Sequence, residues 1–122
     1  MKFENNNFIL NESLIDYNIS DPVTLKVKKF YEEYPFPNYK VTDNKHTILQ
    51  KGDKNSFSKD LKNFIGFNKF FIEIGSGTCQ LSNYLAIGTN NQICAFDSSF
   101  KSLKIGKVFA DKNNIKNVDF IK

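Results

Sequence analysis

The sequence has no tryptophan and no arginine, and its 122 residues include only two cysteines and one histidine. Cys79 and Cys94 lack the C-x-x-C spacing of a zinc site, and His46 is the only imidazole that could join them. A zinc cluster or a cysteine–histidine catalytic pair therefore has too few partners. We predict a protein that holds no metal.

Long apolar runs are also missing from the sequence. The first ten residues contain Glu4 and three asparagines, whereas a signal peptide needs an uninterrupted apolar core at this point. No segment approaches the ~20 apolar residues of a membrane span. These absences predict a soluble, cytoplasmic protein with no membrane contact.

The chain is basic, but the distribution of its charge indicates no particular partner. The net charge is +4, yet the lysines are scattered along the sequence. Arginine, which makes bidentate contacts to guanine and phosphate, is absent. The lysines therefore predict a solvated surface and give no specific signal for nucleic acid.

From residue 70 onward, short apolar segments alternate with amphipathic ones. Residues 70–74, 92–96 and 118–121 are typical of buried strands, and 78–87 and 99–113 are typical of helices. This order predicts right-handed crossovers and a parallel sheet. The fold class is therefore α/β, with an incomplete Rossmann-like parallel sheet of about three strands and flanking helices. We expect the first strand to be covered on both faces, and the second helix to turn Leu103, Val108 and Phe109 inward.

The first residues differ in character and predict an N-terminal helical extension. Residues 1–21 are polar and weakly periodic, which favours an irregular arm. Asp21-Pro22 suits a helix start, because Asp caps free N–H groups and proline at the first position loses nothing by lacking its own. The periodicity predicts a helix over 23–33. Its expected buried face comprises Val23, Val27, Phe30, Tyr31 and Tyr34.

Two prolines follow this helix within Tyr34-Pro35-Phe36-Pro37-Asn38-Tyr39 and predict a stiff aromatic segment, the strap. Residues 40–55 are polar and are expected to form a linker. A helix over 56–65, ended by Gly66, is expected to bury Phe57, Leu61, Phe64 and Ile65. The chain thus divides into residues 1–55, with the arm, helix and strap, and residues 56–122, the first half of the Rossmann-like domain.

A glycine-containing loop lies at the turn from the first strand to the first helix. Gly75 and Gly77, on either side of Ser76, have no Cβ, so the chain can turn sharply and approach a ligand, and free N–H groups at the helix start offer donors. Asp97 ends the next strand, where a carboxylate can accept both hydroxyls of a ribose. Together they predict a site for an adenosine-containing ligand. The alternative is a tight turn that binds nothing.

Two residues near the loop discriminate between ligands. Gln80 stands where the dinucleotide fingerprint G-x-G-x-x-G requires its third glycine. Glu73 precedes the turn, where a carboxylate suits an ammonium group and repels a pyrophosphate. The pattern favours S-adenosylmethionine over NAD. Glu73 has an alternative role, in which it only caps the loop amides.

The segment 71–82, Phe-Ile-Glu-Ile-Gly-Ser-Gly-Thr-Cys-Gln-Leu-Ser, resembles the first motif of class I S-adenosylmethionine-dependent methyltransferases. The strap is similar to a stretch ahead of this domain in a subset of bacterial members, which implies that it covers the cofactor cleft. The family often has glycine at the position of Cys79. The resemblance implies cofactor binding by Glu73, Gly75, Ser76, Gly77, Gln80, Asp97 and Ser98, and it identifies no catalytic residue.

Three functional classes follow from these observations. The first is a methyltransferase acting on an unidentified acceptor, of which this chain is an N-terminal fragment, because the resemblance implies seven strands. The second is a nucleotide-binding Rossmann oxidoreductase, which Gln80 and Glu73 disfavour. The third is a non-catalytic remnant or interaction module. For the isolated chain we expect weak cofactor binding or none, no activity, and self-association or aggregation through the open edge of strand 70–74.

Overall fold

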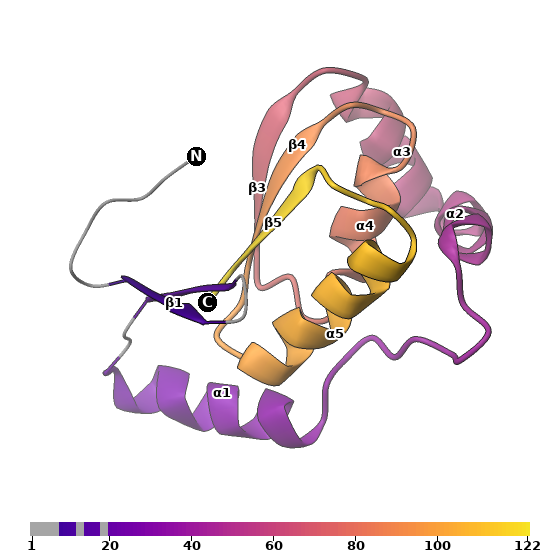
Figure 1. The fold of residues 1–122 in the computed structure, drawn as a ribbon. Helices are drawn as coiled ribbons and strands as arrows, with labels where there is room; N and C mark the ends of the chain where they lie inside the picture. Colours follow the sequence, from indigo (N-terminus) through magenta and orange to yellow (C-terminus); the bar gives the residue numbers. More distant parts are fainter. Residues whose placement is uncertain (1–7, 12–13, 18–19) are drawn as a thin grey trace.

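The computed structural model describes residues 8–11, 14–17 and 20–122, and it centres on a five-stranded sheet (Figure 1). The strand order is β1-β2-β5-β4-β3. The strands β2, β5, β4 and β3 run parallel to one another, and β1 runs antiparallel to β2. The fold is α/β with an incomplete Rossmann-like parallel sheet, as predicted. The strands are β1 (Phe8–Asn11), β2 (Leu14–Tyr17), β3 (Phe70–Ile74), β4 (Gln92–Phe96) and β5 (Val118–Ile121).

The irregular arm predicted for residues 1–21 is wrong for the two segments that form β1 and β2. These segments make an antiparallel ladder, with Ile9 opposite Asp16, and β2 joins the sheet beside β5 through Ile15 and Ile121. The second backbone partner of β2, strand β5, lies about a hundred residues away along the chain. A local pattern of apolar residues does not reveal such a partner.

Five helices are described, and four of them lie on one side of the sheet (Figure 1). The helices α4 and α5 connect the parallel strands, and α2 packs against both α3 and α4. None of the described helices has the length and apolar character needed to cross a bilayer. The bounds are α1 (Pro22–Glu33), α2 (Lys45–Lys54), α3 (Ser56–Ile65), α4 (Gln80–Ala86) and α5 (Phe100–Lys112).

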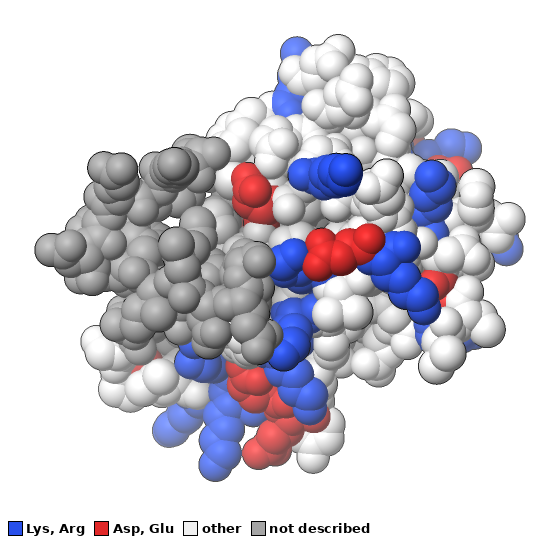
Figure 2. Space-filling model, viewed as in Figure 1, with Lys and Arg blue, Asp and Glu red and all other residues white. Residues whose placement is uncertain are grey.

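The core lies between the sheet and these helices. It is built mainly from buried side chains of β4, β5, α4 and α5, among them Ile93, Ala95, Leu103 and Phe120. On the molecular face shown in Figure 2, lysines are interspersed with acidic and uncharged residues. The described part of that face therefore carries no continuous basic patch.

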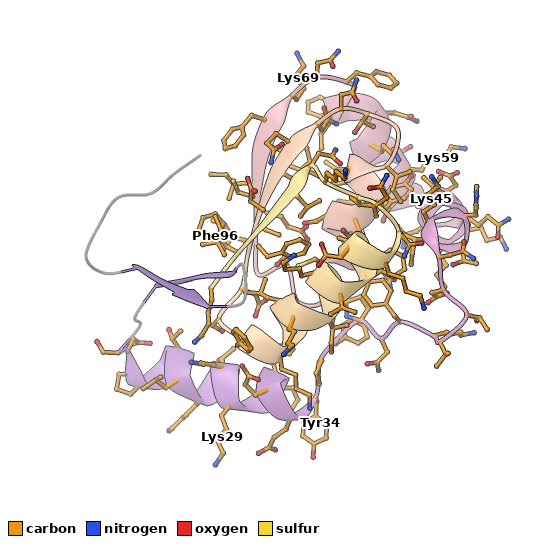
Figure 3. All side chains as sticks on the ribbon, viewed as in Figure 1. Lys29, Tyr34, Lys45, Lys59, Lys69 and Phe96 are labelled. Carbon is orange, nitrogen blue, oxygen red and sulfur yellow. The ribbon has the colours of Figure 1, made fainter. Side chains whose placement is uncertain are left out.

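The opposite face of the sheet is uncovered along β3, so the expectation that this strand is covered on both faces is wrong. Phe70, Ile72 and Ile74 are 54%, 51% and 86% exposed. Phe96, paired with Ile74, lies on the same side, away from the helices (Figure 3). Both crossover helices after β3 and β4 pack on the other face.

The linker predicted over residues 40–55 is wrong, because it contains α2. The Asn44 side chain accepts hydrogen bonds from the backbone N–H groups of His46 and Thr47, and Thr47 Oγ1 accepts one from Asn44 N. Ile48 is only 1% exposed and joins the core. The Asp43 carboxylate forms an ion pair with Lys51, with Oδ2 and Nζ 2.6 Å apart. The capping residues Asn44 and Thr47 can be read from the sequence. A helix with one buried residue, however, shows almost no apolar periodicity by which to predict it.

The helix α1 begins as predicted, with Asp21 accepting from Thr24 N at 2.7 Å. Its predicted burial is wrong, because α1 has no buried residue. Polar contacts hold the helix instead: the Glu32 carboxylate accepts from Lys101 N at 3.2 Å, and the Tyr31 carbonyl accepts from Ser102 Oγ at 3.5 Å. The side chains expected inside but at least partly exposed are Val23, Val27, Phe30, Tyr31 and Tyr34.

Two other helices bury a narrower strip than predicted. Leu61 and Ile65 of α3 and Leu103 and Phe109 of α5 pack against or within the core. The other apolar side chains of these two helices are exposed, because no described element packs against them. Phe57, Phe64 and Val108 are 68%, 89% and 56% exposed, so their predicted burial is wrong.

Candidate functional site

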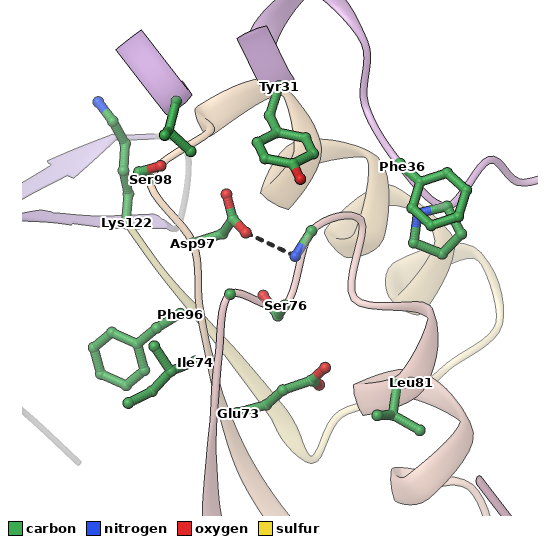
Figure 4. A pocket seen from close by; sticks show the side chains of 14 residues that line it. Tyr31, Phe36, Glu73, Ile74, Ser76, Leu81, Phe96, Asp97, Ser98 and Lys122 are labelled. Atoms are coloured by element: carbon green, nitrogen blue, oxygen red, sulfur yellow. Dashed lines mark hydrogen bonds between the residues drawn. The ribbon is translucent and has the colours of Figure 1, made fainter. Parts of the chain in front are cut away.

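A cavity of about 810 Å³ lies at the carboxyl ends of β3 and β4 (Figure 4). Parallel strands of open α/β sheets commonly place their ligand sites at this end. Ser76 of the loop and Asp97 after β4 both line the cavity. The structure brings together six of the seven sequence-predicted site residues, namely Glu73, Gly75, Ser76, Gly77, Asp97 and Ser98.

Gln80 is the seventh predicted residue, and the structure places it outside this cavity. Its side chain lines a smaller cavity of about 230 Å³, together with residues of α2 and α3. Its Nε2 group donates to the Asn38 carbonyl oxygen at 3.5 Å. Gln80 thus contacts the backbone just after the strap's two prolines and does not line the cavity that Ser76 lines.

The loop is fastened to the end of β4. The amides of Gly75 and Ser76 both donate to the Phe96 carbonyl oxygen, at 2.8 and 2.9 Å. The next amide, Gly77 N, donates to Asp97 Oδ2 at 2.8 Å (Figure 4). These bonds set the loop's position relative to the carboxylate.

The strap fastens the other side of the loop. Thr78 N donates to the Phe36 carbonyl oxygen at 3.2 Å, and Thr78 Oγ1 donates to the Pro37 carbonyl oxygen. Tyr39 donates its hydroxyl to the Thr78 carbonyl oxygen at 3.1 Å and accepts from Asn83 Nδ2 at 3.0 Å. Burial raises the pKa of Tyr39 far above its ordinary value, so the hydroxyl remains a donor.

The loop amides over residues 75–79 are therefore not free donors, and the free donors expected at the helix start are left to the first turn of α4, which begins at Gln80. The last amide of the loop, Cys79 N, donates to the Ser76 carbonyl oxygen at 2.8 Å. Every backbone N–H over residues 75–79 has an acceptor within the chain. The loop has the turn geometry of a ligand-binding loop, but its amides are already used.

Asp97 is fixed from both sides. Its Oδ1 accepts from Ser99 N at 2.8 Å, and its Oδ2 accepts from Gly77 N. A carboxylate oxygen can accept two hydrogen bonds, so each oxygen keeps one position for a ligand. The carboxylate is thus held in place while it can still accept from two hydroxyls.

Glu73 extends from β3 toward α4 and lines the cavity beside Ser76. Its carboxylate accepts a hydrogen bond from Ser82 Oγ. Burial raises the pKa of Glu73; hydrogen bonding to Ser82 offsets part of this effect, and the nearby Asp97 charge adds to it. The loop amides over residues 75–79 have other acceptors, but Glu73 also accepts from the Ser82 backbone N–H in the first turn of α4, so the capping role stays an alternative.

Replacement of Glu73 by glutamine is expected to stabilise the chain at pH 7. A carboxyl whose pKa is raised on folding opposes folding above its unfolded value of 4.5, so stability is lost as the pH rises through the folded pKa. Glutamine removes that loss and can still accept from Ser82. Thermal melts should show a higher midpoint for Glu73→Gln than for the unmodified chain at pH 7 and little difference at pH 4. The exposed Asp60→Asn is the control, and equal gains in both variants would contradict the assignment.

Cys79 has a backbone conformation that glycine adopts most easily. Its φ of +57° lies in the left-handed region, and it is the N-cap of α4. The side chain is fully buried, with Sγ 3.3 Å from Ser76 Oγ. Burial raises the pKa of the thiol to about 12, so it stays protonated. Cys79 is therefore an unreactive packing residue.

The outer wall of the cavity is apolar and comes from the N-terminal unit. Val27 and Tyr31 of α1 and Phe36 and Pro37 of the strap line it (Figure 4). Sequence reasoning expected the strap at the cleft and missed both Val27 and Lys122. Neither missed residue belongs to a motif, and only the arrangement of α1 and β5 brings them to the cavity.

Comparison of the chain with protein-family models, with curated proteins and with solved structures finds no match.

Proposed function

We propose that this chain binds S-adenosylmethionine and forms the cofactor-binding portion of a methyltransferase. One observation carries the proposal: the carboxylates of Glu73 and Asp97 line one cavity beside a loop whose amides are already bonded. Such a cavity suits a ligand that brings positive charge and hydroxyl groups and carries no phosphate. S-adenosylmethionine has an ammonium group, a sulfonium and a ribose.

Each carboxylate has a role that follows from its position. Asp97 would accept the two ribose hydroxyls through its remaining lone pairs. Glu73 would accept the ammonium group, which would favour its ionised form despite burial. Ser98 lies next to Asp97 on the wall and would face the adenine.

The chain contributes to the reaction by positioning. When bound, S-adenosylmethionine would supply an electrophilic methyl group on its sulfonium, with a neutral thioether as the leaving group. Holding the two reactants aligned supplies much of the rate in such transfers. The acceptor would approach past the aromatic wall of Tyr31 and Phe36. We place this activity in the cytoplasm, consistent with the two free thiols.

A nucleotide-binding oxidoreductase is the weaker proposal. A pyrophosphate in a Rossmann site is bound by amides at the glycine loop and helix start. Here the amides over residues 75–79 are bonded within the chain. Glu73 and Asp97 would also repel the phosphates.

The experiment is a titration of ¹⁵N-labelled chain with S-adenosylhomocysteine and, separately, with NAD, followed by amide chemical shifts. We expect S-adenosylhomocysteine to move the resonances of residues 73–77 and 97–98, with a dissociation constant in the millimolar range, on the order of 1 mM. NAD should move them far less.

Matched variants make this titration specific. Asp97→Asn removes the charge and one acceptor oxygen, and should weaken S-adenosylhomocysteine binding at least about tenfold, equivalent to ~1.4 kcal/mol. Asp60→Asn, exposed on α3 and outside the cavity, should leave binding unchanged. Larger shifts with NAD, or no response to S-adenosylhomocysteine at solubility-limited concentration, would refute the proposal.

A further inference from the structure

Thr78 joins two walls of the candidate cavity, although it does not line the cavity itself. The residue is completely buried, and all three of its polar groups bond to the strap. Its N–H donates to the Phe36 carbonyl oxygen at 3.2 Å, and its Oγ1 donates to the Pro37 carbonyl oxygen. Its own carbonyl oxygen accepts from the Tyr39 hydroxyl at 3.1 Å. One residue of the loop thus holds the strap at three points.

The residues on either side of this contact face the cavity. Phe36 and Pro37 belong to its apolar wall, and Gly77 lines it beside Asp97 (Figure 4). The Gly77 amide donates to Asp97 Oδ2 at 2.8 Å. Because Gly77 and Thr78 are consecutive, a movement of Thr78 also moves the donor that orients the Asp97 carboxylate. The position of Thr78 therefore sets the separation between the apolar wall and this carboxylate.

The helix α5 supports both the strap and the loop at this place. A Cβ added to Gly106 of α5 would lie 2.5 Å from the Thr78 carbonyl oxygen, so the helix backbone passes directly beside it. The Tyr39 ring stacks on Phe109 of the same helix, with 4.4 Å between the ring centroids. The strap and the loop are thus anchored to one helix as well as to each other.

We propose that Thr78 is a positioning residue of the cavity, whose hydroxyl holds the strap at a fixed distance from Asp97. Without that hydroxyl, the Pro37 carbonyl loses this donor, and the strap occupies its native position for a smaller fraction of the time. The consequence for binding rests on the proposed function, in which one S-adenosylmethionine contacts both walls. Its apparent dissociation constant then rises in inverse proportion to that fraction.

Replacement of Thr78 by valine is the direct test. Valine keeps the branched shape and the backbone N–H but lacks the hydroxyl. The affinity for S-adenosylhomocysteine should fall about fivefold, the factor that one lost hydrogen bond provides. Thr78→Ser keeps the hydroxyl and should bind within about twofold of the unmodified chain. Equal affinity of Thr78→Val and the unmodified chain would overturn the proposal.

Thr89→Val is the matched control for stability. Thr89 is 3% exposed, and its hydroxyl donates to the carbonyl oxygens of Leu85 and Ala86, at 2.8 and 3.2 Å. It lies after α4 and outside the candidate cavity. Thr89→Val should lower the midpoint of thermal unfolding by an amount similar to Thr78→Val, yet keep the full affinity for S-adenosylhomocysteine. An equal loss of affinity in both variants would overturn the positioning role, because Thr78 would then act only through stability.

Amide hydrogen exchange of the ligand-free chain provides a second readout. The Gly77 amide reports local opening of the loop, and the Ile93 amide, bonded to the Asn117 carbonyl oxygen, reports global unfolding. Thr78→Val should lower the protection of Gly77 about fivefold, because the strap is released more often. Thr89→Val should lower protection at Ile93 and leave Gly77 unchanged. Equal losses at Gly77 in the two variants would overturn the proposal.

The two measurements separate the positioning role from the proposed function. The expected response at Gly77, with no binding of S-adenosylhomocysteine by any form of the chain, would support the positioning role and refute the proposed function. Binding by the unmodified chain that Thr78→Val retains in full, with Gly77 still protected, would refute the positioning role and support the proposed function.

Discussion

Replacement of Gly77 by alanine is expected to destabilise the chain by about 3 kcal/mol. Gly77 has a φ of +55°, and a Cβ there would lie far inside van der Waals contact with the Phe36 carbonyl oxygen. The left-handed conformation alone costs alanine ~1 kcal/mol. Moving the strap away would also break the two hydrogen bonds that Thr78 donates to it, each worth about 1 kcal/mol. Urea denaturation at pH 7 would measure the loss.

Gly75 provides the matched control. Its φ of +74° imposes a similar backbone strain, but an added Cβ would meet nothing within 4 Å. Gly75→Ala should therefore cost only ~1 kcal/mol. Equal losses at the two positions would show that the strap does not rest on the loop.

Replacement of Gly106 by alanine is expected to cost about 2 kcal/mol, although alanine is the better helix former. Gly106 lies in α5, and a Cβ would come within 2.5 Å of the Thr78 carbonyl oxygen and 2.8 Å of Cys79 Cβ. Intrinsic propensity favours alanine by ~1 kcal/mol. Overpacking of a rigid site typically costs 1 to 3 kcal/mol or more. The displaced helix would also lose the bond from Asn83 Nδ2 to the Gly106 carbonyl oxygen, at 3.2 Å.

Val108 on the same helix is the control for Gly106→Ala. Its side chain is exposed, so Val108→Ala should change the free energy of unfolding by no more than ~0.5 kcal/mol. Urea denaturation of both variants separates the cost of overpacking at Gly106 from the effect of helix propensity. A stabilised Gly106→Ala would mean that α5 and the loop are not in close contact.

The strands and helices after residue 56 were predictable because their periodicity and their ends agree. The strand bounds 70–74, 92–96 and 118–121 are those expected, and Gly66 ends α3 as predicted. What a local pattern does not contain is the partner of each apolar surface. Phe70 and Val108 have the spacing of buried residues, yet no described element covers them.

The candidate site was predictable in part for a similar reason. Spacing alone placed Asp97 at the end of the strand beside the loop, because parallel strands bring their carboxyl ends together. The loop's hydrogen bonds were not predictable, since Thr78 finds its acceptors in Phe36 and Pro37, about forty residues earlier. The bonding of the Thr78 amide therefore depends on the strap, which the local sequence does not place beside the loop.

The position of α1 has a consequence for folding and for ligand exchange. The strands β3, β4 and β5 are neighbours along the chain, whereas α1 reaches α5 across about seventy residues and buries no side chain fully. Segments with few buried contacts open first, well below the free energy of global unfolding. The mouth of the cavity should therefore close last during folding and open first in the native ensemble. A ligand could exchange through this local opening while the sheet stays intact.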